Sequence, residues 1–107
     1  MKIVFVSHAI GGDVKANLKD LRRIIKKINL DYENVIPFCP YYSDVVSLDD
    51  AIPWQRIRGM NNAKYILANM AIDELWLTGT HISAGMKEEM EIAKIERITI
   101  VDYINQI

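Results

Sequence analysis

The sequence predicts a small α/β domain built on a doubly wound, four-stranded, mainly parallel sheet. Short apolar segments typical of strands alternate with longer segments in which apolar residues recur every three or four positions, as in helices. Strand–helix alternation implies right-handed crossovers and a sheet with helices on both faces. We expect the strand order 2-1-3-4, a flavodoxin-like or Rossmann-like arrangement. The 107 residues suffice for a single domain, residues 1–107.

Four short apolar segments are predicted to be strands. Residues 2–6 are apolar on both faces, as expected for a strand in a covered parallel sheet. Residues 35–38 include Pro37, which cannot donate a ladder hydrogen bond, so this strand belongs at an edge. The remaining two strands are residues 75–77 and 98–101.

Three longer segments are predicted to be helices. The first begins after Asp13, a residue that can cap it, and carries an apolar stripe of Val14, Leu18, Leu21, Ile25 and Ile28. The second begins after Asp50, tolerates Pro53 in its first turn and continues to Met70. The third spans residues 85–95.

Residues 39–50 separate the second strand from the second helix without a sustained apolar period. We expect a long loop there, of the kind that carries function in compact domains. Tyr41, Tyr42 and Asp44 of this segment are therefore candidates to line a ligand.

The predicted strand order places a ligand site at a definite point of the sheet. In the order 2-1-3-4 the winding reverses between the first and third strands, and ligands bind outside the carboxyl ends of the strands at such a switch point. This rule selects the loops at residues 7–12 and 78–83. Their candidate ligand-binding or catalytic residues are Ser7, His8, Gly11, Gly12, Thr78, Gly79, His81 and Ser83.

The third helix begins directly after the second of these loops. Its first turn presents free backbone N–H groups and the positive end of the helix dipole, which suits an anion such as phosphate. Ser83 and Gly85 lie at that end, and Glu89 shares a side of the helix with Met86 and Ala93, so it should face inward. On spacing alone, Ser83 could simply be an N-cap and Glu89 a residue that favours the dipole.

Two sequence motifs resemble those of the nucleoside 2-deoxyribosyltransferase superfamily, most closely its deoxynucleoside monophosphate N-glycosidase branch. The first is S-x-G-x-x-x-E-x-x-x-A, formed by Ser83, Gly85, Glu89 and Ala93. The second is FVSHAIGG at residues 5–12, which is similar to that family's first strand and glycine-bearing loop. Asp73 fits the aspartate that opens the family's later strand.

The resemblance implies a catalytic role for Glu89 as the nucleophile that attacks C1′ of a deoxyribonucleotide. It implies that the amides around Ser83–Gly85 and the Ser83 hydroxyl hold the 5′-phosphate, and we expect the helix N-terminus to help keep Glu89 ionised. Two family residues are replaced: Tyr65 stands where an aspartate would assist the leaving base, and Val4 where a tyrosine would orient the glutamate. His8, His81, Tyr65 or one of Tyr41 and Tyr42 could supply the missing acid, and the two histidines, which lie in the site loops, are the better candidates. Tyr65 is also a candidate substrate contact.

Three functions remain open from the sequence. The first is a nucleotide N-glycosidase or deoxyribosyltransferase. The second is a nucleotide-binding or nucleotide-sequestering domain of the same fold without catalysis, which the replacements at positions 4 and 65 favour. The third is an unrelated flavodoxin-like interaction module.

Composition restricts the partners and the compartment. The formal charge is −1, so we expect a small-molecule nucleotide or deoxynucleotide as ligand and no nucleic acid. The lone Cys39 excludes an internal disulfide framework and a cysteine zinc cluster, and two histidines are too few for a metal site, so we expect no metal and no cofactor. No apolar run reaches the roughly 20 residues of a membrane span, and a cytoplasmic protein is expected.

Self-association is also expected, as a homodimer or a higher homo-oligomer. The second helix carries apolar residues beyond one narrow stripe, and a four-stranded sheet has limited room to cover them. The residues concerned are Met60, Tyr65, Leu67 and Met70.

Overall fold

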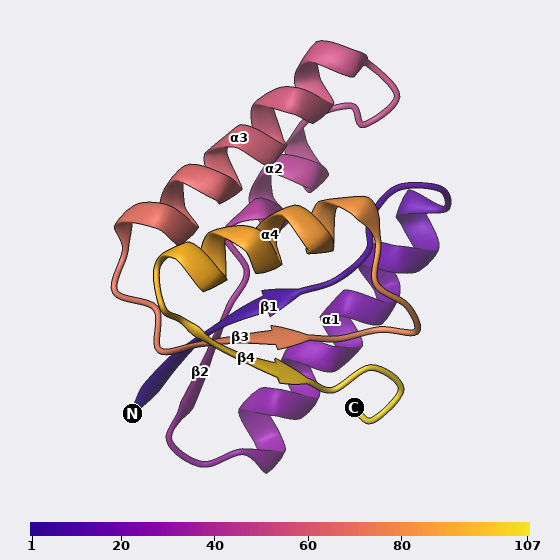
Figure 1. The fold of residues 1–107 in the computed structure, drawn as a ribbon. Coiled ribbons are helices and arrows are strands. Elements are labelled where there is room, and N and C mark those ends of the chain that lie inside the picture. The colour runs from indigo at the N-terminus through magenta and orange to yellow at the C-terminus, as the bar shows by residue number, and fades with distance from the viewer.

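The computed structural model describes residues 1–107 and contains four strands and four helices (Figure 1). In chain order the elements are β1 (Lys2–Ser7), α1 (Val14–Asp31), β2 (Val35–Phe38), α2 (Tyr41–Ser47), α3 (Pro53–Asn69), β3 (Glu74–Leu77), α4 (Ala84–Ile95) and β4 (Thr99–Asp102). The predicted strands and helices are all present, and α2 is an additional helix. Strand boundaries lie within one residue of those expected, and α1 extends three residues beyond Ile28, the last residue of its predicted apolar stripe.

The four strands form one sheet in the order β2-β1-β3-β4, with every pair parallel, which confirms the predicted fold class. β1 lies inside the sheet, where Val4 pairs with Pro37 of β2 on one side and Glu74 of β3 on the other. Its last four residues are fully buried. β2 is an edge strand, as the missing N–H of Pro37 predicts.

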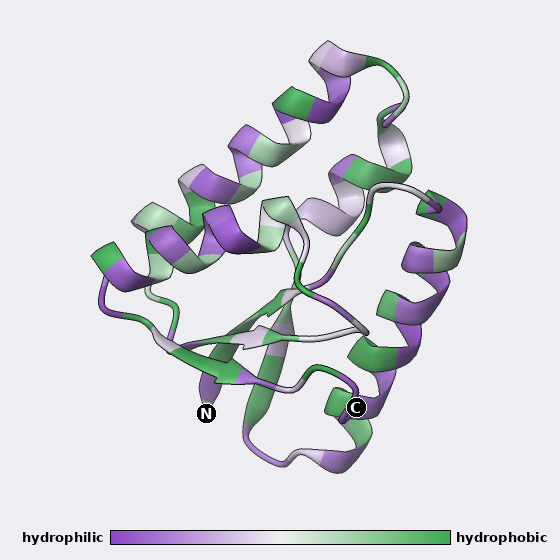
Figure 2. Cartoon of the chain, turned by 45° about the vertical axis from the view of Figure 1, so that its right-hand side comes forward, coloured by the Kyte–Doolittle hydropathy of each residue, from purple (hydrophilic) through white to green (hydrophobic).

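The helices cover the sheet from both sides. Figure 2 shows α1 on one side of the sheet, with α3 and α4 on the other. The buried stripe of α1 consists of Leu21, Ile24 and Ile28. On the other face α4 packs against β3 and β4, and α3 packs against α4 and α2. No helix is both long enough and apolar enough to cross a bilayer.

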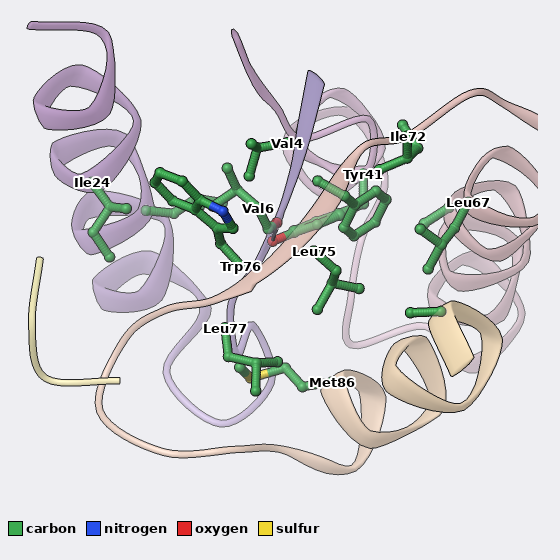
Figure 3. Close-up of a cluster of buried hydrophobic side chains, with 14 of the residues drawn as sticks. Val4, Val6, Ile24, Tyr41, Leu67, Ile72, Leu75, Trp76, Leu77 and Met86 are labelled. Atoms are coloured by element: carbon green, nitrogen blue, oxygen red, sulfur yellow. Dashed lines mark hydrogen bonds between the residues drawn. The ribbon is translucent and has the colours of Figure 1, made fainter. Parts of the chain in front are cut away.

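Side chains of β3 alternate between the two cores (Figure 3). Trp76 points toward α1, where its ring lies 5.2 Å from that of Tyr32 and 4.6 Å from that of Tyr103. Leu75 points to the opposite face, toward Leu67 of α3. The short strand therefore anchors both layers, and the loop that follows it is held between two packed cores.

The segment expected to be a long loop contains α2 instead. Tyr41 is buried, and its hydroxyl donates a hydrogen bond to the Val6 carbonyl at 2.8 Å. Asp44 packs closely against Gly59 of α3 and accepts a hydrogen bond from Asn62 at 3.3 Å. Seven residues are too few to show an apolar period, so tertiary contacts rather than local sequence stabilise this helix. Gly59, which is unfavourable for α3 taken alone, allows α2 to approach.

The start of α3 also differs from expectation. Its N-cap is Ile52, which makes no side-chain cap hydrogen bond, and Pro53 occupies the first helical turn. Asp50, the predicted cap, instead lines the cavity described below. Proline at the first position supplies a helical φ angle and no orphan N–H, so α3 begins without a polar cap.

Candidate functional site

A cavity of about 330 Å³ lies outside the carboxyl ends of β1 and β3, at the switch point of the sheet. Its walls come from the loop after β1, from α2 and α3, and from the loop and first turns of α4. Of the residues predicted for the site, His8, Gly11, Gly12, His81, Ser83, Gly85 and Glu89 line it. The volume falls within the range of small-molecule sites.

The other predicted residues lie behind the cavity or away from it. Ser7, Thr78 and Gly79 are not part of its lining. Thr78 is fully buried and donates hydrogen bonds from its backbone N–H and its hydroxyl to the Ser7 carbonyl, at 2.9 and 2.8 Å. These contacts hold the two site loops in register. Tyr65 lies 71% exposed on α3 and does not line the cavity.

The surroundings of Glu89 shift its pKa strongly. Glu89 lies on α4 about one and a half turns from the Ser83 N-cap, partly buried in the cavity wall, and Oε1 accepts a hydrogen bond from the Ser7 hydroxyl at 2.8 Å. Burial raises the pKa of Glu89 to about 7, although the Ser7 hydrogen bond and the positive charge of Lys64 act in the opposite direction. Burial therefore outweighs the contacts that favour the ionised form, and part of this carboxyl is protonated at neutral pH.

A carboxyl group with this pKa has two chemical uses. Near neutral pH it can donate or accept a proton, and its ionised fraction can attack an electrophilic carbon. Ser7 makes the hydrogen bond that orients the Glu89 carboxyl. Val4 of β1 has no polar side-chain group and is fully buried in the sheet, so it cannot take this role.

The start of α4 contains Ser83 and Gly85, two of the predicted ligand contacts. Ser83 is its N-cap, and the Ser83 oxygen accepts a hydrogen bond from the Met86 N–H at 3.3 Å. The hydroxyl proton of Ser83 remains able to donate. No Cβ is present at Gly85, so the first turn presents bare backbone toward the cavity.

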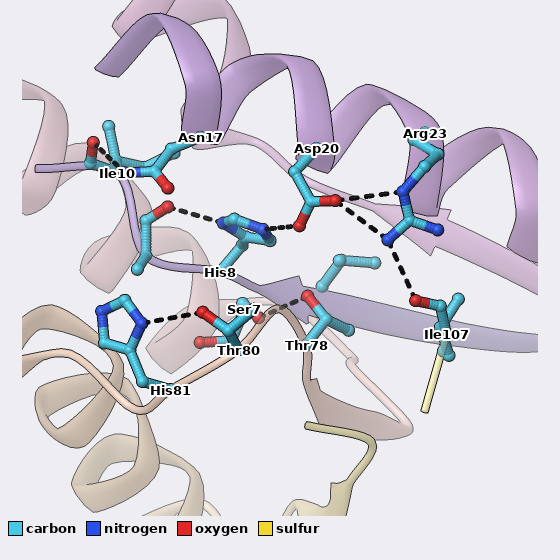
Figure 4. Close-up of polar contacts among 12 residues, drawn as sticks. Ser7, His8, Ile10, Asn17, Asp20, Arg23, Thr78, Thr80, His81 and Ile107 are labelled. Atoms are coloured by element: carbon cyan, nitrogen blue, oxygen red, sulfur yellow. Dashed lines mark hydrogen bonds and ion pairs between the residues drawn. The ribbon is translucent and has the colours of Figure 1, made fainter. Parts of the chain in front are cut away.

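His8 is held by the protein on both sides of its ring (Figure 4). Nε2 lies 2.8 Å from Oδ2 of Asp20 on α1, and Nδ1 contacts the Ala9 carbonyl. Burial opposes ionisation of Asp20, but hydrogen bonds from His8 and Arg23 hold its pKa below the usual value. A His8 ring nitrogen would have to break one of these contacts to reach a ligand.

His81 is the less constrained histidine. It is exposed, lines the cavity, and its only polar contact joins Nδ1 to the Thr80 hydroxyl at 3.1 Å (Figure 4). It is therefore better placed than His8 to exchange a proton with a ligand.

Sequence reasoning missed the contribution of α3. Arg56 and Lys64 line the cavity, and Lys64 Nζ lies 2.7 Å from Oε2 of Glu88 on α4. Their signal was spacing: Arg56 lies two helical turns before the buried Ala63, and Lys64 follows Ala63 directly. Tyr41 and Asp44 line the cavity as predicted, whereas Tyr42 does not.

The remaining candidate chemistry is limited. Burial raises the pKa of the Cys39 thiol to about 12, so this cysteine stays protonated and unreactive. No group of three or more histidine, cysteine, aspartate or glutamate side chains is arranged to hold a metal ion.

Fold and site together define a doubly wound α/β domain with a ligand-sized cavity at its switch point and a glutamate of raised pKa in the cavity wall. The profile of a family described as a domain of unknown function, DUF7768, matches residues 2–103. The chain therefore belongs to that family. A search of curated proteins found no match.

Proposed function

We propose that this protein binds a nucleotide or deoxynucleotide and cleaves or transfers its N-glycosidic bond, with Glu89 as the nucleophile. The observation that carries the proposal is the position of Glu89: it lies in the wall of a cavity at the switch point and is held by Ser7. The Ser83–Gly85 turn on the same wall offers backbone N–H groups to a 5′-phosphate.

The proposed reaction is a double displacement. Ionised Glu89 attacks C1′ of the deoxyribose, the C1′–N bond breaks, and the base leaves with the electron pair and takes up a proton. Water or a second base then attacks C1′ and releases Glu89. His81 is the better of the two histidines to protonate the leaving base, because both nitrogens of His8 already have oxygen partners.

Base release tests this proposal. Incubation with the four deoxynucleoside monophosphates should liberate free base, detected by chromatography. Glu89→Gln keeps the size of the side chain and should abolish release while leaving binding largely intact. Glu91→Gln is the matched control, since Glu91 lies exposed on the same helix and pairs only with Lys94. Base release that is undiminished in Glu89→Gln would defeat the mechanism.

A second candidate is a domain that binds a nucleotide without cleaving it. It is favoured by the exposure of Tyr65, by the engaged ring of His8, and by the raised pKa of Glu89, which leaves less nucleophile at neutral pH. In that case a nucleotide should raise the melting temperature by mass action and be recovered unchanged after long incubation. Failure of every nucleotide to bind would favour an interaction module instead.

The proposal extends to assembly and compartment. A homodimer or higher homo-oligomer is proposed because Trp54, Ile57 and Tyr65 expose apolar surface on one side of α3. A cytoplasmic location is proposed because the lone, half-buried Cys39 suits a reducing compartment.

A further inference from the structure

Arg56 is a cation of the cavity wall that has no partner in the protein. The other cation that α3 contributes to the cavity wall, Lys64, pairs with Glu88. His8 pairs with Asp20. Arg56 takes part in none of the ion pairs, and its side chain makes no hydrogen bond, although Asp44 and Asp50 line the same cavity. Its five N–H donors are therefore free.

The guanidinium lies directly over the glycine loop. Its Nη2 lies 3.2 Å, and its Cζ 3.7 Å, from the position that a Cβ on Gly11 would occupy. Because Gly11 has no side chain, the planar end of Arg56 lies close against the loop. A bulkier residue at position 11 would push the guanidinium away.

Helix stability does not explain this position. Arg56 lies in the first turns of α3, where the helix dipole is positive and a cation is unfavourable, and no acidic residue occupies the first turn to compensate. Arg56 also lies close to the side of α3 that carries the buried Ala63, whereas Arg58 projects to the opposite, outer side.

We propose that Arg56, beside the Gly11–Gly12 loop, is a second contact to the phosphate that the Ser83–Gly85 amides bind, and that this contact makes the protein select phosphorylated over unphosphorylated nucleosides. A guanidinium fits a phosphate with two parallel hydrogen bonds, a match that an ammonium group cannot reproduce. The inference rests on the proposed function for the nucleoside part of the ligand. The anion contact itself depends only on Arg56 and the glycine loop.

The measurement is the ratio of affinities for a deoxynucleoside 5′-monophosphate and for the same deoxynucleoside, obtained by titration calorimetry at fixed ionic strength. Glu89→Gln serves as the background so that no cleavage occurs. Adding Arg56→Gln should weaken monophosphate binding about 10- to 100-fold and leave nucleoside binding within about twofold. Arg56→Lys should give an intermediate loss. The matched control is Arg58→Gln, which removes the same charge from the outer side of α3 and should change neither affinity by more than about twofold.

Folding is checked separately by the melting temperature without ligand. Arg56→Gln should leave it unchanged or raise it, because it removes a cation from a helix N-terminus. The inference fails if Arg56→Gln still binds the monophosphate more tightly than the nucleoside by the wild-type ratio, or if Arg58→Gln lowers that ratio equally. Either result would show that Arg56 does not bind the phosphate, while nucleotide binding by the protein would stand.

Inorganic phosphate and ribose 5-phosphate separate this inference from the proposed function. If no nucleotide binds but either compound raises the melting temperature in an Arg56-dependent way, the anion contact is supported and the nucleotide assignment is overturned. If no phosphorylated compound binds the wild-type protein at millimolar concentration, both are overturned.

Discussion

At the scale of single residues, Glu89 links the chemistry of the site to the stability of the fold. Its folded pKa is about 7, above the ordinary value of 4.5, so the folded state binds more protons than the unfolded state between these pH values. The resulting stabilisation is fully present below pH 4.5 and is lost as the pH rises through 7. The difference corresponds to at most about 3 kcal/mol.

Glu89→Gln should therefore be more stable than the wild-type protein at pH 8 and nearly equal to it at pH 4. The amide avoids the cost of a desolvated charge, and its oxygen can still accept the Ser7 hydrogen bond. We expect a gain of about 1–3 kcal/mol at pH 8, several degrees in melting temperature for a domain of this size. Denaturation at both pH values measures it, with the exposed Glu91→Gln as control. A Glu89→Gln variant less stable than wild type at pH 8 would contradict the raised pKa.

At the scale of elements, the contact between α3 and α4 adjusts the same carboxyl. Lys64 and Glu88 form an ion pair at 2.7 Å across the two helices, and both charges act on Glu89: that of Lys64 lowers its pKa and that of Glu88 raises it. We expect this ion pair to change the pKa of Glu89 more than the free energy of unfolding, because partly exposed ion pairs contribute little to stability.

Lys64→Met should raise the pKa of Glu89 above 7, because it removes a nearby positive charge while retaining an unbranched side chain. Glu88→Gln should move the pKa in the opposite direction. The pKa is read from the pH titration of the Glu89 carboxyl carbon by NMR. Lys87→Met, on an exposed position of α4, serves as the control and should leave it unchanged. Equal pKa values in the two cavity variants would show that the helix pair does not control the site.

At the scale of the whole molecule, α3 leaves one side uncovered. Trp54 is 67% exposed, Ile57 56% and Tyr65 71%, and their spacing places them on one face, opposite the buried Gly59, Ala63 and Leu67. Of the residues on which self-association was predicted, Met60 and Leu67 are used inside the monomer, while Tyr65 and Met70 remain exposed.

We expect two copies to associate through this face of α3, since exposed aromatic residues on one helix face are typical of interfaces. Light scattering at micromolar concentrations should report a mass above that of one chain, and Trp54→Arg should shift it toward the monomer. Val46→Arg, at an exposed apolar position on α2, tests whether the effect is specific to α3. A wild-type protein that stays monomeric at several hundred micromolar would disprove this prediction.

The sequence by itself determined the strands, the three longer helices, the parallel order, and the two loops that border the cavity. These features follow from apolar periodicity, a capping serine and glycines, which act within a few residues along the chain. The inward direction of Glu89 followed in the same way, from its spacing relative to Met86 and Ala93.

Only the tertiary structure decided what surrounds those residues. Contacts with Val6 and Gly59 stabilise α2, and His8 is hydrogen-bonded to Asp20. Tyr65 is exposed to solvent, and Arg56 lies over Gly11. The raised pKa of Glu89 belongs to the same category. Desolvation depends on how many atoms from separate elements exclude water from one carboxyl group, and the local pattern of apolar residues does not predict that number.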